Sequence, residues 1–211
     1  MRFSLSQFKH PIVQAPLGGG PSTVALAAAV SDAGGLGFLA AGYRSTAAVR
    51  EEIGELRGLT GRPFGLNLFV PGPALADRSA LEAYASGLGD EARRYGVELG
   101  EPVHDDDGWD EKLALAADEH VPVVSLTFGC PRRAAVEALH AAGCAVWVTV
   151  TTAEEAAVAQ EAGADALVVQ GVEAGGHRGS FDEGAPGDLG LSRCSSSRTP
   201  RPICRWWPPA A

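Results

Sequence analysis

The chain has 211 residues, of which 45% are hydrophobic and 20% charged, and its formal net charge is −9. This composition predicts a folded globule of one domain, or one domain with a short tail, and excludes a disordered chain. The negative charge argues against nucleic acid as the main partner. No stretch approaches about 20 consecutive apolar residues, which excludes a membrane-spanning helix. The four cysteines are spaced neither as a disulfide framework nor as a metal site.

Up to residue 190, short apolar runs alternate with alanine-rich stretches of helical periodicity. The apolar runs predict six strands, at residues 12–15, 36–40, 64–69, 121–126, 145–150 and 166–170. The periodic stretches predict helices that begin after Ser22, Ser45 and Thr152 as N-caps, a long helix at 75–95, a short helix ending near His120, and a helix at 132–142. Thr152 and Glu155 have the spacing of a capping box.

The acidic segment at residues 101–111 is predicted to be a solvated loop. Its consecutive carboxylates, Asp105, Asp106 and Asp107, point in different directions and do not match the spacing of a calcium loop. No metal site is therefore expected.

Three predicted helices end in Ala-Gly and run directly into an apolar strand, at Gly34, Gly143 and Gly163. Glycine at this place allows the left-handed conformation that ends a helix. Repeated strand–helix–strand units with apolar strands predict a parallel sheet covered by helices. A (βα)₈ barrel and an open doubly wound sheet both fit this pattern.

Three glycine-containing or polar segments follow predicted strands, at the edge where parallel folds place their chemistry. Residues 14–20, with three consecutive glycines, form either a flexible turn or a close approach to a planar or anionic ligand. Asn67 interrupts an apolar strand and either braces a loop or hydrogen-bonds a ligand. Cys130 is interpreted as a small residue in a tight loop, because no neighbour would activate its thiol.

The segment at residues 168–179 is the most informative one. Its strand ends in Gln170, and four glycines then surround one imidazole, His177. A lone histidine is usually a surface residue, but here the glycines would let a ligand approach it without obstruction. An imidazole also titrates near neutral pH, which suits a general base.

At these residues the sequence resembles the nitronate monooxygenase family, formerly called 2-nitropropane dioxygenases. The matching segments are QAPLGGG at 14–20, GGLGFLAAGY at 34–43, RPFGLNLFVP at 62–71 and VVQGVEAGGHRG at 168–179. The resemblance implies a (βα)₈ TIM-barrel flavoprotein that uses FMN and O₂ to oxidise an alkyl nitronate to a carbonyl compound and nitrite.

The same resemblance implies roles for individual residues. Ala15 and Pro16 would lie near the flavin ring, Asn67 and Gln170 would hydrogen-bond it, and Gly175 and Gly176 would contact it through their backbone. His177 would be the catalytic base that removes the α-proton of a neutral nitroalkane. A nitronate or nitroalkane and O₂ are the expected partners, without nucleic acid or membrane, and a homodimer is compatible with them. Residues 1–10 contain no secretory leader, so the expected location is cytoplasmic.

After about residue 190 the sequence departs from the family. Residues 191–211 hold four arginines, four prolines and no acidic residue, so residues 1–190 have a net charge of −13, four below that of the whole chain. We expect an incomplete barrel of about six βα units at 1–190, and an irregular, out-of-frame tail at 191–211 in which prolines exclude further strands. The two loops that would bind the FMN phosphate are absent, so the affinity for FMN should fall.

Two alternatives remain open from the sequence. One is a flavin-dependent enoyl-acyl-carrier-protein reductase, which has similar glycine motifs. The other is an inactive fragment without catalytic function.

Overall fold

The computed structural model describes residues 8–74, 77–182, 184, 187–192 and 204–205. The strands are β1 (Gly37–Ala40), β2 (Phe64–Phe69), β3 (Val123–Thr127), β4 (Ala145–Val150), β5 (Ala166–Val169) and β6 (Cys204–Arg205). The helices are α1 (Val24–Asp32), α2 (Thr46–Leu59), α3 (Arg78–Gly87), α4 (Gly89–Tyr95), α5 (Trp109–Asp118), α6 (Arg133–Ala141) and α7 (Ala153–Ala162). The chain divides into two compact units, one formed by residues 1–71 and 107–211 and the other by Gly72–Asp106.

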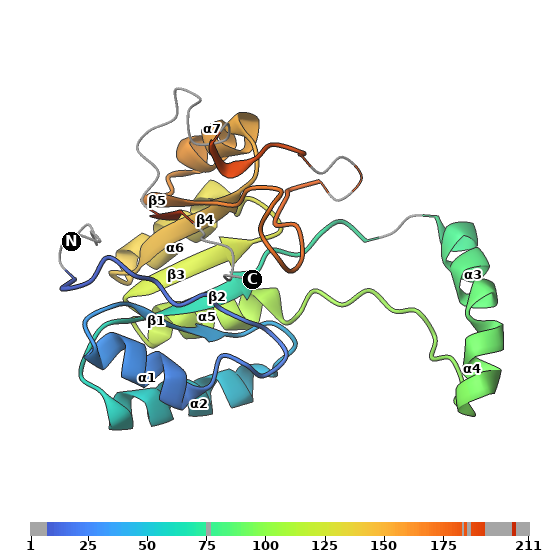
Figure 1. The fold of residues 1–211 in the computed structure, drawn as a ribbon, viewed down its shortest axis with the longest axis horizontal. Helices are drawn as coiled ribbons and strands as arrows, with labels where there is room; N and C mark the ends of the chain where they lie inside the picture. The colour runs from blue at the N-terminus through green and yellow to red at the C-terminus, as the bar shows by residue number, and fades with distance from the viewer. Residues whose placement is uncertain (1–7, 75–76, 183, 185–186, 193–203, 206–211) are drawn as a thin grey trace. The chain divides into compact units, whose positions relative to one another are not determined.

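The sheet of the larger unit is entirely parallel, and its strands lie side by side in chain order from β1 to β6 (Figure 1). A doubly wound sheet reverses its strand order at a switch point, whereas a barrel adds each new strand on the same side. The uninterrupted order therefore identifies a partial (βα)₈ barrel. Successive helices of this unit contact each other in the order α1, α2, α5, α6, α7.

The two faces of the sheet have different cores, because side chains alternate along each strand. One face packs against the helices and carries most of the buried aliphatic residues, such as Leu66, Leu126 and Val148. The other face, which corresponds to the barrel interior, carries a second cluster: Leu36, Phe38, Val123, Ala145, Trp147 and Ala166. In the row across the sheet that contains Trp147, the interior side chains of Asn67 and Ser125 are polar.

The predicted helix ends are confirmed where local signals are strong. Gly34, Gly143 and Gly163 have φ angles of 97°, 83° and 102°, so each adopts the left-handed conformation. Ser45 caps α2, and Thr152 with Glu155 forms a complete capping box on α7. The prediction for α1 was one residue off, because its cap is Thr23 rather than Ser22.

Two predicted elements differ from the structure. Residues 12–15 form only one bridge, between Val13 and Leu36, because the flanking Pro11 and Pro16 limit the ladder. The helix predicted at 75–95, whose first two residues lie outside the described residues, is two helices, α3 and α4. They separate at Leu88, where glycines on both sides lower the helix propensity.

The prediction that prolines exclude any strand from the tail was wrong. Cys204 and Arg205 pair in parallel with Val168 and Val169, in the five-residue stretch without proline between Pro202 and Pro208. The rest of the predicted tail from residue 193 lies outside the described residues, and its out-of-frame origin stays a prediction.

The acidic segment is not simply a solvated loop. The side chain of Asp107 is only 19% exposed, and its Oδ1 lies 2.8 Å from Nζ of Lys112, which is 3% exposed. Lys112 also donates to the carbonyl of Ala41 at 3.0 Å, and Asp107 accepts the backbone N–H of Tyr43. This buried ion pair ties the start of α5 to the loop that follows β1.

In the smaller unit, Asp77 caps α3 by accepting the backbone N–H groups of Ser79 and Ala80. Hydrogen bonds from the Ser79 hydroxyl and from these two amides lower the pKa of the Asp77 carboxyl. Gly96, with φ of 64°, ends α4. Across the described residues, none of the helices combines the length and apolarity needed to cross a membrane.

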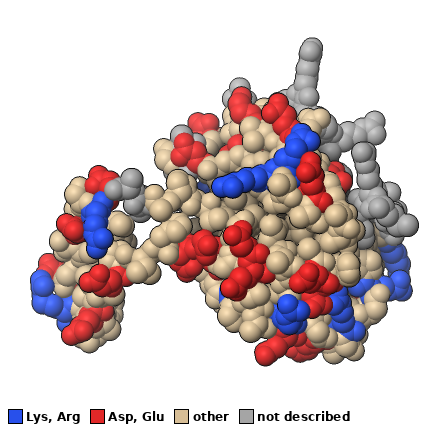
Figure 2. All heavy atoms as spheres, turned by 180° about the vertical axis from the view of Figure 1, so that it is seen from behind, with Lys and Arg blue, Asp and Glu red and all other residues tan. Residues whose placement is uncertain are grey.

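On the face drawn in Figure 2, acidic side chains are spread over the surface and the basic side chains lie among them. Several basic side chains are paired, for example Arg44 with Glu52 and both Arg50 and Arg57 with Glu119. The expectation that nucleic acid is not a partner stays a prediction.

Candidate functional site

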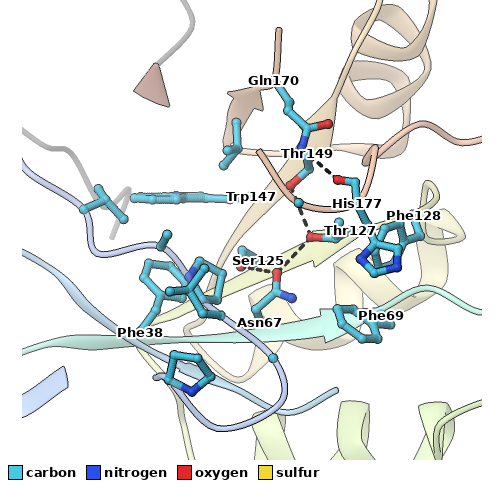
Figure 3. A pocket seen from close by; sticks show the side chains of 18 of the residues that line it. Phe38, Asn67, Phe69, Ser125, Thr127, Phe128, Trp147, Thr149, Gln170 and His177 are labelled. Carbon is cyan, nitrogen blue, oxygen red and sulfur yellow. Dashed lines mark hydrogen bonds between the residues drawn. The ribbon is translucent and has the colours of Figure 1, made fainter. Parts of the chain in front are cut away.

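A cavity of about 720 Å³ lies at the carboxyl ends of the parallel strands (Figure 3). This volume is within the range of about 300–1,000 Å³ that is usual for small-molecule sites. Every residue singled out from the sequence as a site residue lines this cavity: Ala15, Pro16, Asn67, Gln170, Gly175, Gly176 and His177. The fold thus brings together residues that are up to 162 positions apart in the sequence, from Ala15 to His177.

A strip of polar side chains crosses the cavity from β2 to β4. Asn67 Oδ1 accepts the hydroxyls of Ser125 at 2.7 Å and of Thr127 at 3.0 Å. Thr127 Oγ1 in turn lies 3.3 Å from Thr149 Oγ1. Because the single proton of Thr127 is used on Asn67, the proton in the second contact must come from Thr149.

This direction of hydrogen bonding determines what Asn67 presents. Its oxygen has two donors, so its amide orientation is set, and Nδ2 has no partner among the described residues. Asn67 is 3% exposed and lines the cavity. The strip therefore offers an N–H donor at Asn67 and hydroxyl lone pairs beside it, which suits a ligand with mixed donor and acceptor edges.

The deeper part of the cavity is aromatic. The rings of Phe38 and Trp147 are 5.9 Å apart, and both side chains line the cavity. Gly65, the register partner of Phe38, leaves room for its ring, since a Cβ there would lie 2.2 Å from it. Trp147 Nε1 is buried and lacks a partner among the described residues, which makes it a second unused donor in the wall.

The glycine loop after Val13 is organised by Gln14, the first residue of the predicted segment, and by Ser22, which was predicted only as a helix cap. Gln14 Nε2 donates to the carbonyl of Ala15 and to Ser22 Oγ, and Gln14 Oε1 accepts the N–H of Phe38 at 3.0 Å. Ser22 Oγ accepts the N–H of Leu17. The loop is therefore braced against β1, rather than being only the flexible turn that was one alternative.

His177 lies at the exposed side of the cavity, at the end of a row of rings (Figure 3). The ring centroids of His177 and Phe128 are 6.3 Å apart, and those of Phe128 and Phe69 are 4.8 Å apart. The row continues to Tyr43, whose ring centroid is 5.4 Å from that of Phe69, and each pair is edge-to-face. Phe128 has a φ of 73°, an uncommon conformation for a bulky residue. The row forms an apolar wall beside the imidazole.

The electrostatics of the cavity are simple, because His177 is the only ionisable side chain besides Tyr43 among the described residues that line it. Cys130 is not among the lining residues, and burial raises the pKa of its thiol. A raised pKa keeps the thiol protonated and weakly nucleophilic. This agrees with the structural interpretation of Cys130.

Ser125, Thr127 and Thr149 were not predicted as site residues, although the sequence contains a signal for them. Ser125 and Thr127 occupy alternate positions of an otherwise apolar strand, and Thr149 has the same place near the end of β4. Alternate polar residues near the carboxyl end of a buried strand point to the same face as Asn67 on the neighbouring strand. The aromatic row left no comparable local signal, because its rings come from separate loops and strands.

Comparisons with known proteins show which family this chain resembles. The model of the family described as nitronate monooxygenase matches residues 2–194. The nitronate monooxygenase of Pseudomonas aeruginosa is 42% identical over 211 residues, covering 92% of this chain and 58% of that protein.

Two solved structures are also similar to this chain. The nitroalkane oxidase of Streptomyces ansochromogenes is 51% identical with a TM-score of 0.83, covering 90% of this chain and 55% of that one. FabK of Thermotoga maritima is 26% identical with a TM-score of 0.63, covering 90% of this chain and 47% of that one. The chain thus spans about half the length of the relatives it matches.

Proposed function

Because the chain belongs to the nitronate monooxygenase family, we propose that its cavity binds the ring of FMN and that His177 serves a flavin-dependent oxidation of alkyl nitronates. The observation that supports this most directly is that His177 and the unpartnered amide nitrogen of Asn67 open onto the same cavity of about 720 Å³.

The residues present fit the ring of a flavin. A planar heterocycle with donor and acceptor edges matches the polar strip at Asn67, and its apolar faces match the aromatic wall. Gly175 and Gly176 leave open space where a Cβ would stand, so that the backbone can approach a ring closely. The described lining residues include no lysine or arginine, so they offer the phosphate no fixed positive charge.

The chemistry follows from this arrangement. A bound flavin would accept the electrons of the nitronate, and O₂ would be the final oxidant, with a carbonyl compound and nitrite as products. His177 would remove the α-proton of a neutral nitroalkane and hold it on the imidazole. When the substrate arrives as the nitronate anion, no proton has to be removed, and the imidazole acts as an electrostatic partner.

The test compares a neutral nitroalkane with its preformed nitronate anion as substrates, in the presence of added FMN. His177→Asn should lower nitrite formation from the neutral nitroalkane by about 10²–10⁴-fold, the usual contribution of a general base. Nitrite formation from the preformed nitronate should fall much less. FMN binding, measured by quenching of its fluorescence, should remain. Equal losses with both substrate forms would contradict the role of His177.

The enoyl reductase alternative makes a different prediction. It requires that NAD(P)H is consumed with an enoyl thioester and that nitronates release no nitrite. The two substrates, tested on the same preparation, separate these activities. A folded chain that stays colourless with added FMN would instead favour the third alternative, a form without catalytic function.

A further inference from the structure

Gln170 is the first residue after β5, and its side chain turns back onto the loop that carries His177 (Figure 3). Its Nε2 donates to the carbonyl of His177 at 3.0 Å, and its Oε1 accepts the N–H of Gly179 at 2.7 Å. One side-chain amide thus bonds the backbone on both sides of Arg178.

This segment has further contacts that hold it against the sheet. The Arg178 guanidinium donates twice to the carbonyl of Gly187, at 3.0 and 2.7 Å, and once to the carbonyl of Gln170 at 3.3 Å. Gly179 packs so closely that a Cβ there would lie 2.9 Å from Thr149 Cγ2. The loop is thereby fixed at Arg178 and Gly179, immediately after the imidazole.

The two residues before His177 are less constrained than the two residues after it. Gly175 and Gly176 are exposed, and Gly176 has a φ of 83°. Glycines maximise the conformational freedom of a loop, so they cannot by themselves hold a side chain in one place. The backbone at His177 is therefore held by the contacts on its carboxyl side, while its ring lies edge-on to that of Phe128.

We propose that Gln170 is a positioning residue for His177, in addition to any contact it makes with a cofactor. The sequence suggested only a bond to the flavin, but the geometry puts both ends of the amide on the loop backbone. Gln14 has a similar arrangement at the opposite wall, where its amide also joins a carbonyl to a backbone N–H.

The proposal rests on the proposed function for its catalytic consequence, because a displaced imidazole would remove the α-proton of a nitroalkane less efficiently. Its structural part needs neither flavin nor activity. The two parts are therefore tested separately on the full 211-residue chain.

The first arm measures hydrogen exchange at the Gly179 amide without FMN, in three variants. Gln170→Met removes both bonds, and Gly179 should exchange about tenfold faster or more. Gln170→Glu keeps an acceptor for Gly179 but cannot donate to His177, so protection of Gly179 should largely persist. Gln160→Met is the matched control, because Gln160 is exposed on α7. Unchanged protection of Gly179 in Gln170→Met overturns the proposal.

The second arm compares nitrite formation from a neutral nitroalkane with that from its preformed nitronate, at saturating FMN. Both Gln170 variants should lower the rate with the neutral substrate more than the rate with the nitronate, in the same direction as a change of His177. Equal losses for the two forms would assign Gln170 to the cofactor or the fold, and overturn the proposal. If the unaltered chain binds no FMN, the proposed function fails and the exchange arm alone decides the positioning role.

Discussion

At the scale of single residues, Glu173 is an acidic group whose titration reports on the His177 loop. Its two carboxylate oxygens accept the N–H of Leu191 at 2.9 and 3.1 Å. Hydrogen bonds from its own backbone amide and from that of Leu191 lower the pKa of the Glu173 carboxyl below its ordinary value of 4.5. A lowered pKa means that the ionised form is favoured by folding.

The hydrogen bonds from the Leu191 N–H to the Glu173 carboxylate should therefore be fully present above pH 4.5. They should be lost as the pH falls through the lower pKa that Glu173 has in the folded state. The chemical shift of the Leu191 amide, followed by NMR from neutral to acidic pH, measures this directly. We expect a midpoint below 4.5. Glu173→Gln, which carries no charge at any pH, should abolish the transition, and a midpoint above 4.5 would contradict the prediction.

At the scale of the elements, close packing of α1 on β1 depends on Gly37. A Cβ at this position would lie 2.0 Å from the carbonyl oxygen of Ala27 in α1. Gly37→Ala should therefore force the helix away from the strand and cost more than about 2 kcal/mol, in the range of overpacked cores. Urea unfolding followed by circular dichroism measures this free energy.

The matched control is Gly54→Ala in α2. Gly54 is exposed and nothing lies within 4 Å of a Cβ placed there. Alanine is favoured over glycine inside a helix by about 1 kcal/mol, so this change should stabilise the chain. If both substitutions shift the free energy of unfolding in the same direction, the packing argument for Gly37 is wrong.

At the scale of the whole molecule, the ion pair of Lys112 and Asp107 joins α5 to the loop after β1 over some 70 positions of sequence. Lys112→Met leaves a largely buried carboxylate without its cation and the carbonyl of Ala41 without its donor. Removing one partner of a buried pair costs about 3–5 kcal/mol. The midpoint of urea unfolding should fall accordingly.

An exposed ion pair gives the comparison for this prediction. Arg50 pairs with Glu119 but its side chain is 55% exposed, so Arg50→Met should cost less than about 1 kcal/mol. A loss for Lys112→Met that is no larger than this would show that the buried pair does not link the two segments energetically.

Much of the fold could be predicted from local signals. The Ala-Gly junctions at Gly34, Gly143 and Gly163, the capping box at Thr152 and the apolar strands are all determined by residues within one or two turns of each other. Predictions failed where a partner far along the chain decided the outcome, as for Asp107 with the backbone of Tyr43 and for Cys204 with Val168.

The candidate site divides in the same way. His177, Gln170, Asn67 and the glycines stand out in the sequence, since each is unusual among its immediate neighbours, and the pattern of strands and helices by itself determined a parallel α/β architecture. Only the tertiary structure decided between barrel and doubly wound sheet, aligned Asn67 with Ser125 and Thr127, and turned the Gln170 amide onto the His177 loop. The physical reason is that strand order, register and loop docking depend on contacts between distant residues, which no local pattern encodes.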